Sequence, residues 1–165
     1  MSRTDAEPTP RTPTGSTWLR AGALAAAASV VGNLAVLGIA DVGDASLAVT
    51  DGGTIHDIAA GGVVGASLVP VVAAVALVAV AALRWFGVVR LAQVVGGTFA
   101  LLSVAGPLAA DTDTGTSIAL AAMHVVTGAS FVIGLEVARR RIVAARRMSA
   151  AGQTRTTGDA PPLAA

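Results

Sequence analysis

The sequence contains no cysteine, no lysine and no tyrosine, and only 13% of its 165 residues are charged. Without cysteine, the chain cannot form disulfides, thiolate metal sites or a catalytic thiol. Charge is scarce as well, because about a quarter of the residues in a soluble domain are charged. Hydrophobic residues instead make up 54% of the chain, and the mean hydropathy is +0.74. These values predict an integral membrane protein.

Short motifs of several large enzyme classes are also missing. The sequence has no Walker loop, dinucleotide glycine fingerprint, HExxH or GxSxG. No group of histidines and carboxylates has the spacing of a known metal site. We therefore expect a protein that is not an enzyme and holds no metal and no cofactor. The basic run at 139–147 is too short to predict nucleic acid binding.

Four apolar stretches are each about 20 residues long, enough to cross a ~30 Å hydrocarbon core as helices. They cover approximately residues 18–40, 60–83, 88–110 and 117–137. The predicted fold class is all-α integral membrane, with a four-helix transmembrane bundle inside a membrane domain at 18–148. The polar segments 1–17 and 149–165 are rich in Thr, Ser, Pro and Arg, which predicts two disordered cytoplasmic tails.

The two signs of charge fall on opposite sides of these stretches. The arginines lie near the termini and in the turn at 83–90, whereas the connections at 41–59 and 111–116 contain aspartates and no basic residue. By the positive-inside rule, both termini and the middle turn are expected in the cytoplasm. The expected location is the plasma membrane of a bacterium, crossed several times.

The first connection has the pattern of a β-hairpin. Residues 46–58 alternate apolar and polar side chains on both sides of Asp51-Gly52-Gly53, a turn sequence. We expect a short extracytoplasmic hairpin between the first two helices. Because an isolated hairpin is marginally stable, it should pack on the helix ends. Pro107, which cannot donate an intrahelical hydrogen bond, should loosen the end of the third helix nearby.

Polar side chains inside an apolar span are costly in lipid and are the first candidates for function. One from each span lies about seven residues from its expected outer end, which corresponds to a shared depth of ~10 Å. This candidate polar layer, or ligand contact, consists of Asn33, Ser67, Ser103 and His124, with Thr127 one turn further along. The pattern predicts a hydrogen-bonded ring or the floor of a small cavity.

His124 has two candidate roles. A structural imidazole would hydrogen-bond to Asn33 or Ser103 and join helices. A functional one would relay protons, contact a quinone or a haem, or, least favoured, bind a metal. Elsewhere, Gly61 and Gly65 have the small-xxx-small spacing of closely packed helices, and Gly128 is expected to act similarly.

A basic cluster follows the fourth span. It consists of Arg139, Arg140, Arg141, Arg146 and Arg147, and Glu136 is placed to pair with Arg140 at i, i+4. The cluster is explained as a stop-transfer signal, and it is also a candidate site for anionic lipid headgroups.

Three short motifs carry a family resemblance. They are Leu102-Ser-Val-Ala-Gly-Pro-Leu108, Thr112-x-Thr114 and Ala122-Met-His124. With these motifs, the chain resembles a family of small four-span membrane proteins from actinobacteria, catalogued as a domain of unknown function. The resemblance covers roughly residues 18–138 and implies location and architecture, since no activity is established for the family. It marks six positions for attention: Gly106, Pro107, Thr112, Thr114, Met123 and His124.

The sequence favours a non-enzymatic helical bundle that binds a lipid-like ligand or assembles with itself or with another membrane protein. Two other functions stay open. A small carrier or channel would need a polar path, so it would have to oligomerise. A redox or enzyme subunit using His124 would need a second reactive group within the membrane, and the sequence offers no candidate for it.

Overall fold

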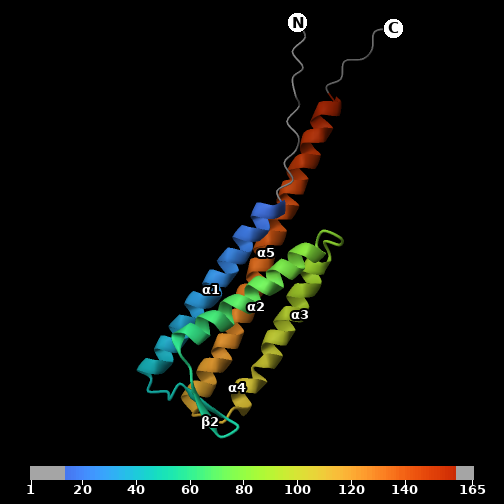
Figure 1. Ribbon diagram of the computed structural model, residues 1–165. Coiled ribbons are helices and arrows are strands. Elements are labelled where there is room, and N and C mark those ends of the chain that lie inside the picture. The colour runs from blue at the N-terminus through green and yellow to red at the C-terminus, as the bar shows by residue number, and fades with distance from the viewer. Residues whose placement is uncertain (1–13, 159–165) are drawn as a thin grey trace, which may run out of the picture.

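The computed structural model describes residues 14–158, which form a bundle of long helices with a small two-stranded sheet at one end (Figure 1). The elements are α1 (Thr14–Val42), β1 (Ala48–Asp51), β2 (Thr54–Asp57), α2 (Ala60–Ala81), α3 (Val88–Ser103), α4 (Ala105–Ala109) and α5 (Thr114–Gly158). The predicted hairpin between the first two helices is therefore confirmed.

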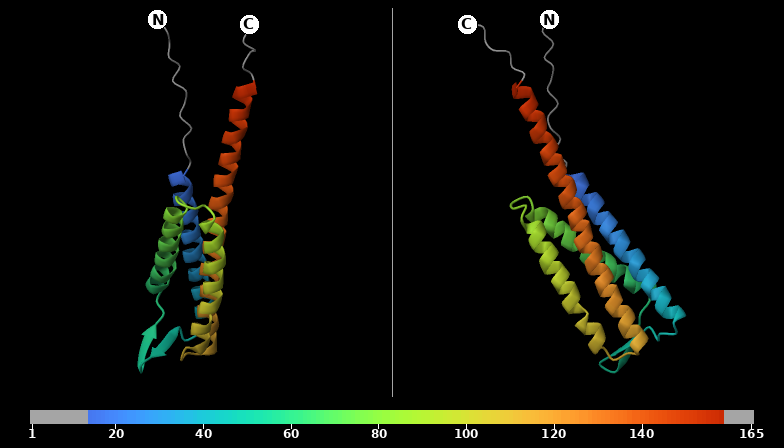
Figure 2. Two further views of the ribbon diagram at one scale, coloured as in Figure 1. Left: turned by 90° about the vertical axis from the view of Figure 1, so that its right-hand side faces the viewer. Right: turned by 180° about the vertical axis from the view of Figure 1, so that it is seen from behind.

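Four helical segments are long and apolar enough to cross a membrane, as predicted: α1, α2, α3 together with α4, and α5. The sheet, α4 and the start of α5 lie at one end of the bundle, which we call the hairpin end (Figures 1 and 2). The α2–α3 turn lies toward the opposite end. Helix α1 packs along α2 and α5, and α3 packs along α5, whereas α2 and α3 touch each other little.

The hairpin has a tight two-residue turn. Strands β1 and β2 pair antiparallel, with Ala48 opposite Asp57 and Asp51 opposite Thr54. The turn residues Gly52 and Gly53 have φ angles of 55° and 81°. Glycine adopts this left-handed conformation without steric cost, and the resulting turn matches the twist of the strands.

Two helices extend beyond the predicted limits. Helix α1 begins at Thr14 instead of residue 18, and α5 continues to Gly158, far past residue 137. The prediction of a disordered segment from residue 149 is wrong up to Gly158. Alanine and arginine, which are good helix formers, make up most of residues 138–151, and the next proline is Pro161, so the helix can continue past the apolar span. The remaining parts of the predicted tails, 1–13 and 159–165, lie outside the described residues.

The third span is interrupted near Pro107. Helix α3 ends at Ser103, and α4 starts at Ala105 after a turn at Val104. In a continuous helix the Ser103 carbonyl would bond to the nitrogen of residue 107, which carries no hydrogen in proline. The predicted loosening is thus a break in the helix. In contrast, α2 continues through Pro70.

Small residues let α1 and α5 approach closely. Ala25 is 3% exposed, and a Cβ atom added at Gly134 would lie 2.5 Å from the Ala25 Cβ. Gly128 lets α5 approach α3 closely, as predicted, because a Cβ added there would lie 2.3 Å from the Ala100 Cβ. For Gly61 and Gly65 the prediction is wrong, because a Cβ added at either position would meet nothing within 4 Å.

Candidate functional site

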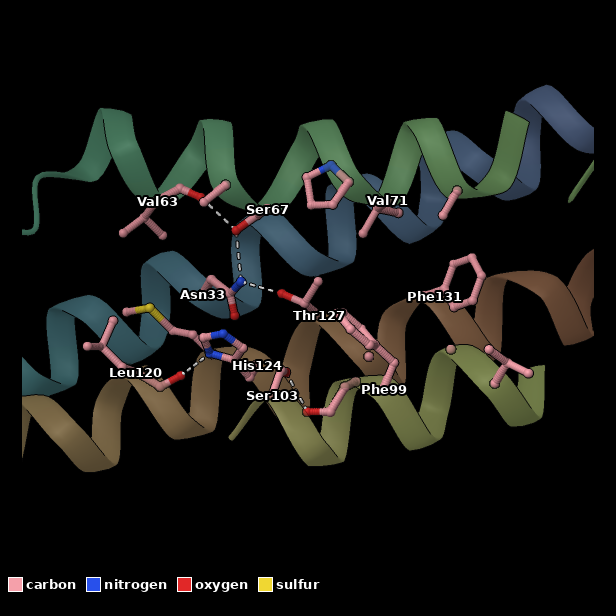
Figure 3. A pocket seen from close by; sticks show the side chains of 18 of the residues that line it. Asn33, Val63, Ser67, Val71, Phe99, Ser103, Leu120, His124, Thr127 and Phe131 are labelled. Carbon is pink, nitrogen blue, oxygen red and sulfur yellow. Dashed lines mark hydrogen bonds between the residues drawn. The ribbon is translucent and has the colours of Figure 1, made fainter. Parts of the chain in front are cut away.

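Three members of the predicted polar layer meet between α1, α2 and α5. The Asn33 side-chain nitrogen lies 2.8 Å from the Ser67 hydroxyl and 2.8 Å from the Thr127 hydroxyl, and it donates to both (Figure 3). The Ser67 hydroxyl donates to the Val63 carbonyl, and the Ser29 hydroxyl donates to Thr127. Asn33 thereby connects three helices in the middle of an apolar bundle.

The other two members bond within their own helices. The Ser103 hydroxyl donates to the Ala100 carbonyl at 2.8 Å, and the His124 Nδ1 atom lies 2.8 Å from the Leu120 carbonyl oxygen (Figure 3). The predicted bond from His124 to Asn33 or Ser103 is therefore wrong. A carbonyl one turn earlier on the same helix is the nearer partner, so His124 joins no helices.

All five predicted residues nevertheless line one cavity of about 690 Å³. It lies between α2, α3 and α5, with Asn33 reaching it from α1. The five polar side chains line the part toward the hairpin end (Figure 3). The rest of the lining is apolar and includes Val71, Leu77, Val95, Phe99, Met123 and Phe131. The cavity is therefore amphiphilic along its length.

One polar atom in this region lacks a partner. The Asn33 side chain is 3% exposed, and its Oδ1 atom is buried and accepts no hydrogen bond. A buried acceptor without a partner costs roughly 1–3 kcal/mol. Figure 3 shows this oxygen directed toward His124, on the side of Asn33 that faces away from the Ser67 bond.

The hairpin is attached to the connection between α4 and α5. The Thr50 backbone nitrogen donates to the Asp111 carbonyl at 3.0 Å, which forms a β-bridge between the two residues. The Thr112 hydroxyl donates to the Ala48 carbonyl at 2.5 Å. We call the bonds between residues 46–50 and 111–116 the clasp. They supply the packing that an isolated hairpin requires.

Asp113 is the central side chain of the clasp. Its carboxylate accepts from the Ser46 backbone nitrogen at 3.0 Å and from the Ser46 hydroxyl, and it also accepts from the Thr116 backbone nitrogen at 3.1 Å. These hydrogen bonds, of which the one from the Ser46 hydroxyl has the largest effect, hold the pKa of Asp113 well below its usual range. The Thr116 hydroxyl in turn accepts from the Leu47 nitrogen at 2.9 Å. One aspartate thus caps α5 and binds the start of the hairpin.

Four of the six residues marked by the family resemblance lie in these two regions, and the other two, Gly106 and Pro107, lie in α4. Thr112 belongs to the clasp, and the Pro107 carbonyl accepts a bond from the Ser117 hydroxyl of α5 at 2.8 Å. Thr114 is the first residue of α5, and Gly106 is exposed in α4. Met123 is 6% exposed and lines the cavity beside His124.

The basic cluster is only partly free to bind anions. Arg139 and Arg140 both pair with Glu136 at 2.7 Å, so the predicted pair with Arg140 is confirmed and a second one is added. The Arg146 guanidinium lies over the Phe86 ring, 4.7 Å from its centre. Arg141 and Arg147 are exposed, and the described part of the chain gives them no ion pair.

Sequence reasoning missed three residues of these networks: Ser29, Ser46 and Thr116. Ser29 is four residues before Asn33, so it lies on the same helix face, a spacing that could have identified it. Asp113 followed three residues later by Thr116 is consistent with a helix N-terminus, where an aspartate accepts from the third helical nitrogen. From that signal, the fourth helix would have been predicted to begin at residue 114. Ser46 has no comparable local signal.

Comparison with known proteins places the chain in a family. No curated protein and no solved structure matches it. A match extends over residues 13–141, which cover the four candidate spans up to the arginine run and include both the cavity and the clasp. The chain therefore belongs to DUF6069, a family of unknown function.

Proposed function

We propose that the protein lies in the bacterial plasma membrane with both termini in the cytoplasm, and that it binds a lipid-like ligand without catalysing a reaction. The observation that carries this proposal is the cavity of about 690 Å³ between α2, α3 and α5. Pockets for small organic ligands have about 300–1,000 Å³ and are mostly apolar with a few placed polar groups.

The mouth of the cavity favours a ligand that enters from lipid. Leu77, Val95 and Phe99 line the cavity, and they are also 72%, 57% and 73% exposed. The cavity is thus open to the apolar outer surface of the bundle. In a membrane this surface would contact acyl chains, so a hydrophobic molecule could enter sideways without crossing water.

The lining also favours binding over transport. Toward the α2–α3 turn, the cavity is bounded by residues such as Val71, Ala74 and Leu77, and none of the described lining residues is charged. A carrier for a polar solute would need polar groups along this half as well. A hydrocarbon chain needs only apolar surface there.

Native mass spectrometry of protein purified in mild detergent tests the proposal. The wild type should retain a small lipid-like molecule. Ala66 of α2 lines the cavity, and Ala66→Phe should displace the ligand by filling the space. Ala73→Phe is the matched control, because Ala73 is exposed on the same helix and does not line the cavity.

Retention by the wild type and Ala73→Phe, together with loss in Ala66→Phe, would support the proposal. A wild type that carries no molecule, or equal retention in both variants, would overturn it. So would a dimer that only Ala66→Phe dissociates, because the cavity would then be an interface between two copies.

A further inference from the structure

The hydrogen bonds around Asn33 fix which way its amide points. The Ser67 hydroxyl gives its proton to the Val63 carbonyl, so toward Asn33 it can act only as an acceptor. It must therefore face the Asn33 nitrogen and not the oxygen. This leaves the Asn33 Oδ1 atom as the group directed toward His124 (Figure 3).

The tautomer of His124 is fixed in the same way. Its Nδ1 atom lies 2.8 Å from the Leu120 carbonyl oxygen, which can only accept, so Nδ1 carries a hydrogen. In the neutral ring the other nitrogen, Nε2, then carries a lone pair. His124 lines the cavity, so its Nε2 atom is an acceptor that a ligand can reach and that no donor among the described residues satisfies. Asn33 Oδ1 lies beside it but is closed off from the cavity.

We propose that the ligand of this cavity is a neutral lipid alcohol, whose hydroxyl donates a hydrogen bond to His124 Nε2 beside Asn33. This inference rests on the proposed function and specifies its ligand class. The hydrocarbon body of the alcohol fills the apolar part of the cavity along Val71, Val95 and Phe131. The hydrocarbon core supplies no water that could satisfy His124 Nε2 instead.

Other headgroups fit this acceptor less well. A carboxylate or phosphate would bring negative charge to a lone pair, and the described lining offers no cation to offset it. An ammonium group would be buried without a counter-charge. A ketone, an ester or an ether has no proton to donate. A hydroxyl is the simplest head group that is neutral and can donate a hydrogen bond.

Three probes of equal chain length separate these chemistries: hexadecanol, hexadecyl methyl ether and palmitate. Each is added to detergent micelles at the same mole fraction, and the complex with full-length protein is counted by native mass spectrometry. The donated bond should favour hexadecanol over the ether by about tenfold. Palmitate should be retained no better than the ether.

Variants locate the donated bond. His124→Phe removes the acceptor, leaves the interhelical bonds of Asn33 in place and should abolish the preference for the alcohol. His124→Gln, whose side-chain oxygen can still accept a hydrogen bond, should retain part of the preference. Ser149→Ala is the control, since the Ser149 hydroxyl also donates to its own helix but does not line the cavity.

The outcomes distinguish this inference from the proposed function. Equal retention of alcohol and ether, or a preference for palmitate, would overturn the alcohol while leaving a lipid-binding cavity. A preference that survives in His124→Phe would also overturn it. If no probe is retained and the purified wild type carries no molecule, the proposed function itself fails.

Discussion

The side-chain nitrogen of Asn33 in α1 and the hydroxyl of Thr127 in α5 are 2.8 Å apart, although 94 residues separate them in the sequence. Together with the bond to Ser67, this contact makes Asn33 the polar centre of the bundle. The two ends of the contact belong to helices that also pack through small residues along their length.

Thr127→Val should lower the free energy of unfolding by about 1–2 kcal/mol, because the Thr127 hydroxyl accepts interhelical hydrogen bonds from Asn33 and Ser29, and each is worth somewhat under 1 kcal/mol on average. Ser103→Ala should cost less than about 0.5 kcal/mol, since its bond is local. Unfolding in mixed micelles with increasing SDS measures both. Equal losses for the two variants would contradict the central role of the Asn33–Thr127 contact.

Gly134→Ala should destabilise the bundle more than Gly65→Ala. The added Cβ at Gly134 would lie 2.5 Å from the Ala25 Cβ, so α1 and α5 would have to move apart. At Gly65 the new methyl group meets nothing within 4 Å and improves helix propensity. We expect a melting temperature lower by several degrees for the first and unchanged or higher for the second. A stabilised Gly134→Ala protein would be inconsistent with the described α1–α5 packing.

Acid should open the clasp. Hydrogen bonds from Ser46 and Thr116 depress the pKa of Asp113 in the folded state. The unfolded state therefore binds more protons at low pH, and the stabilisation from Asp113 is complete above its unfolded pKa of about 4. It is lost as the pH falls from there toward the lower folded pKa.

Hydrogen exchange of the Thr50 amide, corrected for the intrinsic exchange rate at each pH, measures this opening. Protection should fall on acidification in the wild type, and Asp113→Asn should remove most of that pH dependence. Asp111→Asn is the control, because Asp111 contributes only its backbone carbonyl to the clasp. Acid-insensitive protection in the wild type would rule out Asp113 as its cause.

The predicted orientation can be tested by single cysteines, since the natural chain has none. In intact cells, a membrane-impermeant maleimide should label Thr54→Cys in β2 and leave Ser149→Cys in α5 unlabelled. Both positions are exposed. After the cells are broken open, both should react. Labelling of Ser149→Cys alone in intact cells would reverse the topology.

Anionic lipid retention should depend on the unpaired arginines. We expect Arg141→Gln and Arg147→Gln each to weaken phosphatidylglycerol retention by about fivefold. Arg139→Gln should have a smaller effect, because Glu136 already neutralises that guanidinium. Lipid counts by mass spectrometry in nanodiscs would check this, and equal effects at Arg139 and Arg141 would contradict it.

The sequence predicted the elements better than their contacts. Hydropathy, an Asp-Gly-Gly turn and Pro107 act locally, so they located four apolar helices, the hairpin and the interrupted third span. Helix ends were less accurate because alanine and arginine in 138–158 favour a helix in water as well as in lipid.

The candidate site was predicted in composition but not in pairing. The prediction from depth along each helix grouped five polar residues that do line one cavity: Asn33, Ser67, Ser103, His124 and Thr127. Which of them bond to each other depends on helix rotation and on competition from local carbonyls. The His124 ring bonds to the Leu120 carbonyl, and the Ser103 hydroxyl bonds to the Ala100 carbonyl. A single sequence contains no direct signal for such a choice.

The clasp also has a consequence for the order in which the chain assembles during synthesis. Ser46 and Asp113, which the clasp joins, are 67 residues apart, so the hairpin leaves the ribosome well before its partners. Until α5 begins, β1 and β2 can form only an isolated hairpin, which is marginal in water. Closing the clasp is therefore a late step in biogenesis, and the protected Thr50 amide should be absent from a nascent chain that ends before residue 111.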